Sequence, residues 1–543
     1  MLGEIYVAHP DRAWTKLQPL LATALGYRPV SLSATLTELL GIPAAYSPGV
    51  AVDKPIVGLV VDGDPPRAIV SVRMNSGAEL LAALTTGKNP THRARPLGEG
   101  RVTQLEPQRR GTAGDVAIGV CGNALLIAAR GADLARYGPY VARELPSHPA
   151  LREEAVVGGV PLSDGSLVVV APTRALRGPV ASRLGEQWKQ AKLRLERQAH
   201  EQRRLHDGRE PDFAEPQAVI AGADRIVQGS IDLLRHADSL TLVAEPLDAT
   251  AKVRVALEVG KQGGARQLLS GLPAGNGRAL LRLPRETIVA LTLHSTESIR
   301  SAFGDWFATA LTQLFGPRLG PADRATIEGA MDALGRGRGD ELSLGLVATA
   351  ENSGLSIQAS VRDSDQLDRG VRGVFRALQV PAVAEPLAAF VGRPRVALDR
   401  VTLGGFDGPV TRARVVWTAP RSPAAPQPTQ VLWAIDKERF YAATGPAADA
   451  ILVAQARAAA HEVASLAADD GAVSALGEIQ QRSVMTLLVG PRALGWSSGD
   501  RAHRPLVLSL GGTDDELVVL LELDHATLVS LAGSSTGLGF FHQ

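Results

Sequence analysis

The chain has 543 residues, which is enough for roughly three or four domains of ordinary size, or for two large ones. Hydrophobic residues make up 45% of it, a globular composition that excludes wholesale disorder. Lys and Arg number 57 against 56 Asp and Glu, and aromatic residues are only 4%. So balanced a charge and so few rings argue against a nucleic acid partner.

The first half alternates strands with helices. A strand-like run ends at His9, and two helical stretches follow that stop at Gly26 and Gly41. A hairpin comes next, with strands at 55–61 and 68–73 around the turn Asp-Gly-Asp-Pro-Pro. Further strands and an alanine-rich helix complete the half.

The second half repeats this order. A strand ends at His294, and an amphipathic helix follows that carries Trp306 on its apolar face. A shorter helix at 323–334 stops at Gly335, as the corresponding helix of the first half stops at a glycine. Its hairpin again leads into a helix, at 364–378.

Short identities accompany the repeated order. Both hairpins end in Ser-Val-Arg, at 71–73 and 360–362. A later strand leads into Arg-Ala-Leu in each half, ending at Leu176 and at Leu494. Because these matches keep their order along the chain, they predict a tandem duplication.

We predict an α+β fold with tandem-duplicated halves at 1–265 and 275–543, each a largely antiparallel sheet backed by helices. We expect the halves to pack about a pseudo-twofold axis, with any large groove between them. The first half also carries an insertion at about 178–236, where helical spacing predicts two amphipathic helices in an antiparallel hairpin. Its basic first helix is typical of a solvated face, or of an arm for an anionic partner.

Motifs for nucleotide or acyl chemistry are incomplete. The Gly-x-Ser-x-Gly match at 533–537 has too little chain after it for the Asp and His of a hydrolase. Lys88 follows Gly87, but the upstream glycine and the Ser or Thr of a phosphate loop are missing. The glycines at 335–339 lie between a predicted helix and a predicted strand, the reverse of a dinucleotide fingerprint.

The titratable residues do not show the sequence spacing that is typical of metal ligands. His9 and His294 lie at matching strand ends, and either a symmetric pair of metal or proton-transfer sites or packing and helix-entry bonding would explain them. The acidic groups at 62–64, 363–368 and 514–515 are typical of turns and helix caps. We therefore predict no catalytic, cofactor-binding or metal-ligating residues, and no cofactor.

The single cysteine and the hydropathy pattern limit the compartments in which we expect the protein. Cys121 lies in an apolar strand pair, which predicts a small buried core residue and excludes an intrachain disulfide. No run of 18 apolar residues predicts a transmembrane segment. The start of the chain has no visible leader, so we expect a cytoplasmic protein, or a periplasmic or cell-envelope one if an export leader is missing.

The repeated unit resembles a family of uncharacterised, exported bacterial cell-envelope proteins that are often lipoproteins. The resemblance rests on the strand pair at 124–131 with the strand at 166–176, on their counterparts at 440–445 and 485–494, and on the hairpin-helix units. It implies export and carries no activity.

Three functions are open at this point. The first is a non-catalytic binding or scaffold protein, possibly of the cell envelope, with a protein or apolar small-molecule partner. The second is a carrier of lipid or another apolar ligand in a cavity between the halves. The third is an enzyme whose site is assembled from distant residues.

Overall fold

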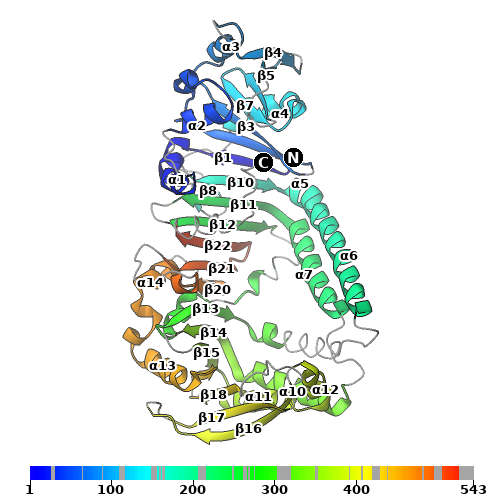
Figure 1. Cartoon of the computed structure of the whole chain (residues 1–543), viewed down its shortest axis with the longest axis vertical. Coiled ribbons are helices and arrows are strands. Elements are labelled where there is room, and N and C mark those ends of the chain that lie inside the picture. The colour runs from blue at the N-terminus through cyan, green and yellow to red at the C-terminus, as the bar shows by residue number, and fades with distance from the viewer. Residues whose placement is uncertain are drawn as a thin grey trace. The chain divides into compact units, whose positions relative to one another are not determined.

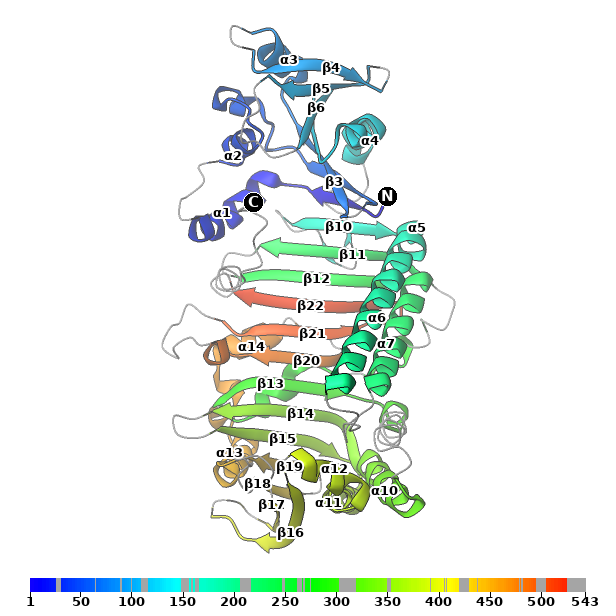
Figure 2. The same ribbon diagram turned by 45° about the vertical axis from the view of Figure 1, so that its right-hand side comes forward.

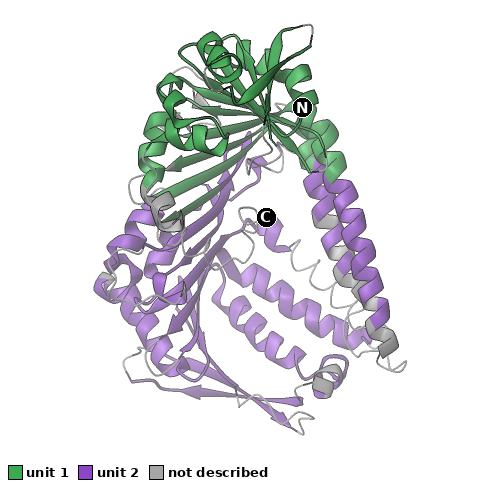
Figure 3. Ribbon diagram, turned by 45° about the horizontal axis from the view of Figure 1, so that its top comes forward, with its two compact units in different colours: residues 1–183, 233–263, 520–543 green, residues 184–232, 264–519 purple. Residues whose placement is uncertain are grey.

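A computed structural model gives the fold of the chain (Figure 1). It describes all residues except 26–30, 64, 88–89, 99, 109–115, 148–155, 158–159, 162–165, 206–215, 247–249, 261–265, 267–268, 274, 302–318, 349–352, 391, 405, 407, 419–428, 437, 478, 480–481, 495–503 and 525–543. The chain divides into two compact units (Figure 3). Unit 1 comprises Met1–Arg183, Leu233–Gly263 and Leu520–Gln543, and unit 2 comprises Leu184–Asp232 and Gly264–Val519.

Unit 1 is built on an antiparallel sheet. Its strands are β1 (Gly3–Val7), β2 (Ile56–Val61), β3 (Arg67–Arg73), β4 (His92–Leu97), β5 (Val102–Pro107), β6 (Ala117–Cys121), β7 (Ala124–Ala128), β10 (Leu167–Pro172), β11 (Ala237–Pro246) and β12 (Thr250–Val259). They pair in the order β4-β5-β6-β7-β3-β2-β1-β10-β11-β12. The short pair β8 (Val156–Val157) and β9 (Val160–Pro161) forms a separate ladder.

Helices cover parts of both faces of this sheet. They are α1 (Pro10–Leu25), α2 (Leu32–Leu39), α3 (Gly77–Thr85), α4 (Gly131–Arg143) and the short α5 (Thr173–Ala175). Ser31 and Ser76 cap α2 and α3, since each hydroxyl accepts a hydrogen bond from a backbone N–H three residues later. One core lies under α4, where Leu134 and Val141 pack on Tyr6 and Leu126 of the sheet.

Unit 2 contains a second antiparallel sheet. Its strands are β13 (Thr287–His294), β14 (Arg338–Ala348), β15 (Ser353–Val361), β16 (Arg393–Val401), β17 (Val410–Thr418), β18 (Thr429–Ile435), β19 (Arg439–Thr444), β20 (Ser483–Val489) and β21 (Leu506–Gly512). They pair in the order β16-β17-β18-β19-β15-β14-β13-β20-β21. Strand β22 (Glu516–Asp524) begins in unit 2 and ends in unit 1.

The starts of two helices in unit 2 are explained by local sequence signals. They are η5 (Gly277–Arg282), α10 (Pro321–Gly337), α11 (Ser364–Ala377), α12 (Pro381–Phe390), α13 (Ala448–Ala460) and α14 (Asp470–Gly477). Asp363 caps α11 by accepting from the Gln366 N–H at 3.0 Å. Helix α10 starts on Pro321, whose fixed backbone angle suits the first helical position.

A long helical hairpin is formed by α6 (Ala181–Leu205) and α7 (Pro216–His236), which lie side by side in Figures 1 and 2. Trp188 donates from Nε1 to Asp224 at 2.6 Å, and Ile231 lies beside Gly185. Because residue numbers rise along α6 as their partners fall along α7, the two helices are antiparallel. This confirms the predicted hairpin.

The structure confirms the α+β class with antiparallel sheets, and it corrects one boundary. Helix α10 does not stop at Gly335 but continues to Gly337. At Gly337, an added Cβ would lie 2.2 Å from the Leu367 nitrogen, so this glycine permits the close approach of α10 to α11. Most of the predicted helix around Trp306 lies outside the described residues.

Candidate functional site

One face of the unit 2 sheet is apolar over five adjacent strands. Residues directly opposite each other in an antiparallel ladder point to the same face, so the registers define it. They give three rows of five side chains, which we call the leucine grid. The rows are Leu506, Val489, Val289, Leu346 and Leu355; Leu508, Leu487, Leu291, Leu344 and Ile357; and Leu510, Met485, Leu293, Leu342 and Ala359.

Most of the grid is partly exposed. Leu346 is 40% exposed, and all the other members except the buried Ala359 have intermediate exposure. Among the described residues, only Leu342, Ile357 and Ala359 join a hydrophobic core cluster, the one that includes Leu334 of α10 and Leu367 of α11. Strand neighbours shield the flanks of each side chain, and the registers make this face aliphatic across all five strands.

The opposite face of the same strands is buried, although it carries a polar row. The row consists of Ser509, Thr486, Thr292, Ser343 and Gln358, none of which is more than 4% exposed. These groups bond within the fold. Ser343 donates to Thr292 at 3.3 Å, and Gln358 donates to the Arg282 carbonyl at 3.3 Å. The buried face of these strands therefore combines this polar row with the apolar core positions Ala290, Leu488 and Val507.

Segments η5 and α14 cover the face that carries the polar row, which explains why that face is buried. Beside the polar row, Ala290 and Leu488 pack with Leu280 of η5 and Leu476 of α14. The contact is close, because an added Cβ at Gly277 would lie 3.1 Å from Cγ2 of Thr486. The covering segments occupy the polar side and leave the leucine side partly open.

Strand spacing gives the size of the grid. Five strands and three rows, two residues apart, span about 19 Å by about 14 Å. This area is close to that of the largest apolar patch on a typical soluble monomer, and such a patch is often a functional site. The long edge matches an extended long-chain acyl group.

Unit 1 carries a comparable face with smaller side chains. Its central row is Val255, Leu242, Val169, Ile5 and Gly58. The first four are partly exposed, whereas Gly58 is buried. Valine and glycine present less apolar surface than leucine, so the grid of unit 2 is the stronger candidate site.

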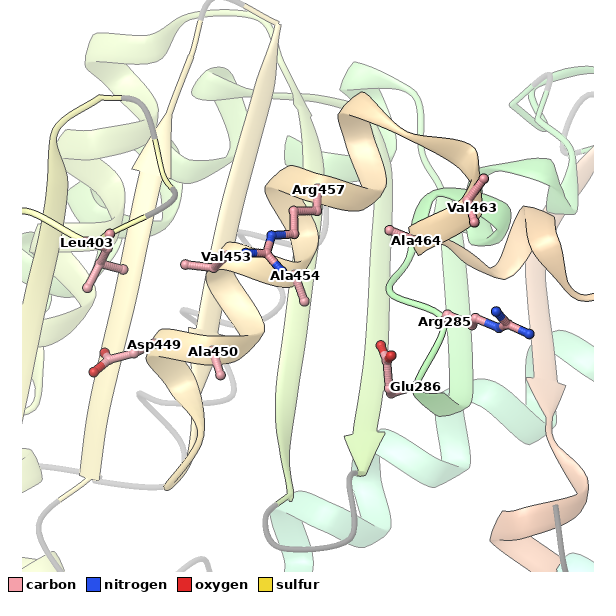
Figure 4. A pocket seen from close by; sticks show the side chains of 11 residues that line it. Arg285, Glu286, Leu403, Asp449, Ala450, Val453, Ala454, Arg457, Val463 and Ala464 are labelled. Carbon is pink, nitrogen blue, oxygen red and sulfur yellow. The ribbon is translucent and has the colours of Figure 1, made fainter.

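A pocket of about 720 Å³ in unit 2 is the second candidate (Figure 4). It is lined by Arg285, Glu286, Leu403, Gly404, Asp449, Ala450, Val453, Ala454, Arg457, Val463 and Ala464. Figure 4 shows the side chains of Arg285 and Asp449 pointing away from each other. The lining combines the carboxylates of Glu286 and Asp449 and the guanidinium groups of Arg285 and Arg457 with small apolar side chains.

The structure describes several of the residues that the sequence analysis singled out. The Cys121 side chain is buried, as predicted. The His9 carbonyl accepts from the Ala13 N–H at the start of α1, and His294 lies 3.1 Å from the Asn276 carbonyl through Nε2. Asp62 accepts from the next N–H of its turn and pairs with Arg183 at 3.1 Å.

Several other motifs fall outside the described residues. These are Asp64, Lys88 and the Gly-x-Ser-x-Gly match at 533–537. The glycines at 335–339 are described, and they form the end of α10 and the start of β14.

The most strongly perturbed tyrosines share one carboxylate in unit 1. Tyr6 and Tyr140 both donate to Glu4, the second at 3.0 Å. Burial, followed by this hydrogen bond, raises the pKa of Tyr140 to about 12 and raises the pKa of Tyr6 further. Both phenols therefore stay neutral at physiological pH, which suits a structural role.

Within the part of the chain that the structure describes, no helix is long and apolar enough to cross a membrane. Nor do three or more His, Cys, Asp or Glu side chains gather there as metal ligands would. Comparisons with protein-family models, curated proteins and solved structures found no match to this chain.

The sequence analysis did not find the grid, although a signal was present. Residues 342–347 read Leu-Ser-Leu-Gly-Leu-Val, where leucine alternates with the smallest residues. Such alternation predicts a strand with two different faces but does not say which face is covered.

Proposed function

We propose that this chain is a non-catalytic binding protein whose ligand is a long aliphatic molecule held on the leucine grid. One observation carries the proposal: a continuous aliphatic face lies partly open while small polar residues of the same strands are buried. An acyl chain that covers this face removes apolar surface from water, the main driving force for such binding.

The composition of the grid favours an acyl chain over a protein partner. Protein interfaces rely on Trp, Tyr and Arg anchors and on hydrogen bonds, whereas the grid contains only Leu, Ile, Val, Met and Ala. Its inner strands β13, β14 and β20 are paired on both edges, so no backbone ladder is open there to an added strand.

The test is a titration of the full chain with a fluorescently labelled long-chain fatty alcohol. Leu291→Asp places a carboxylate at the centre of the grid, and its desolvation should weaken binding by at least roughly tenfold. The control is Leu39→Asp, the same change at a leucine of α2 that is 66% exposed and belongs to unit 1. The control should bind as the parent does.

Thermal unfolding of each variant separates lost binding from lost folding. Should Leu291→Asp not fold, Leu346→Asp repeats the test at the most exposed grid position. Equal alcohol affinity in the parent, a folded grid variant and the control would contradict the proposal.

We also propose that the chain arose by tandem duplication. Support comes from the strand order, since β16-β17-β18-β19-β15-β14-β13-β20-β21 repeats the pairing of β4-β5-β6-β7-β3-β2-β1-β10-β11. Nine strands in one unusual order are improbable by chance. The pseudo-twofold arrangement stays a prediction.

A further inference from the structure

An arginine cluster borders the last row of the leucine grid. Along β15, Val361 lies two residues beyond Ala359 and pairs with Arg338, after a register shift in β14 between Arg338 and Leu342. Ser295 follows two residues after Leu293 of β13. Arg338 donates from Nη2 to the Ser295 hydroxyl at 2.9 Å, which holds its guanidinium beside the end of the grid.

Charges in this cluster do not cancel. Arg300, whose side chain is 2% exposed, pairs with Asp340 at 2.6 Å, and Arg362 pairs with Glu297. In the described part of the chain, Arg338 has a hydroxyl partner but no ion pair. One positive charge is therefore in surplus at the apolar surface.

The environment of Arg338 favours an anion. Burial, and then the charge of the neighbouring Arg300, lower the pKa of Arg338 to about 10, while Asp340 only partly offsets them. A partly desolvated cation loses water without gaining a carboxylate, so a carboxylate or phosphate would restore its lost interaction. The planar guanidinium also suits paired hydrogen bonds to either oxyanion.

We propose that the ligand of the grid is an anionic lipid whose headgroup is held by Arg338, with Ser295 positioning the guanidinium. This inference rests on the proposed function, because it assigns the polar end of the same ligand. The aliphatic chain would cover the grid, and the headgroup would meet the surplus charge at its border.

The experiment compares a long-chain fatty acid with the fatty alcohol of equal length on the full chain. A charge-assisted hydrogen bond predicts that the parent binds the acid roughly tenfold more tightly than the alcohol. Arg338→Gln should bring the acid-to-alcohol affinity ratio close to one, and Arg338→Lys should retain part of the preference for the acid. The matched control is Arg336→Gln, an exposed arginine of α10 paired with Asp332.

The outcomes separate the two proposals. If the parent binds neither ligand, the proposed function fails. If it binds both equally and Arg338→Gln changes nothing, only the headgroup assignment fails. Inorganic phosphate is the third ligand, and if it binds as tightly as the fatty acid, the cluster is a site for a free anion and the inference is wrong.

Discussion

Trp433 shows how a buried polar atom of this fold is satisfied. Its ring is 1% exposed and stacks on Phe375 with centroids 5.5 Å apart, while its Nε1 donates to Asp368 at 3.1 Å. The capping role of Asp363 could be predicted locally, because it immediately precedes a helix. The role of Asp368 could not, since its partner lies 65 residues away on another element.

Replacing Asp368 with alanine should therefore destabilise the protein. The buried indole N–H would lose its acceptor, which costs about 1–3 kcal/mol. Asp332→Ala is the control, because both aspartates also pair with an arginine one turn later on an α-helix. Loss of the exposed Asp332 pair should cost less than about 0.5 kcal/mol, so denaturant unfolding should separate the two variants. Equal losses would refute the role given to the indole bond.

At the level of elements, caps and turns made much of the fold predictable. The helix at 364–378 and the hairpins were set by local patterns such as Asp363-Ser364 and Asp-Gly-Asp-Pro-Pro, and the structure has them as α11, β2 and β3. The grid was not predictable, because burial of the β13 faces is decided by η5 and α14. Helix α14 lies far along the chain, and its packing leaves no mark on the strand pattern.

The α6–α7 hairpin offers a test at this scale. The second half has no counterpart to it, so deletion of 183–235 with a short bridge should leave the cores of both units folded. Two cores intact by near-UV circular dichroism and cooperative melting would agree with an insertion. Global loss of tertiary structure would show that the hairpin is integral to the fold, and it would weaken the proposed duplication. The deletion also removes the ion pair of the partly exposed Arg183 with the exposed Asp62, which should contribute little to stability.

At the scale of the whole molecule, the repeated strand order is the feature that the sequence analysis predicted most nearly. Ordered identities such as Ser-Val-Arg at 71–73 and 360–362 fall at the ends of β3 and β15, with Arg362 one residue past β15. These two strands occupy the same place in the two pairing orders. Sequence could not place the leucine grid, which arises only when five strands distant in the chain are brought into register.

Photo-crosslinking tests the central claim most directly. A long-chain fatty acid with a photoreactive group at mid-chain would be irradiated with the full protein, and the labelled peptides mapped by mass spectrometry. Adducts should concentrate on β13, β14, β15, β20 and β21 and should disappear in Leu291→Asp. Labelling spread over other elements, or unchanged in that folded variant, would contradict the account.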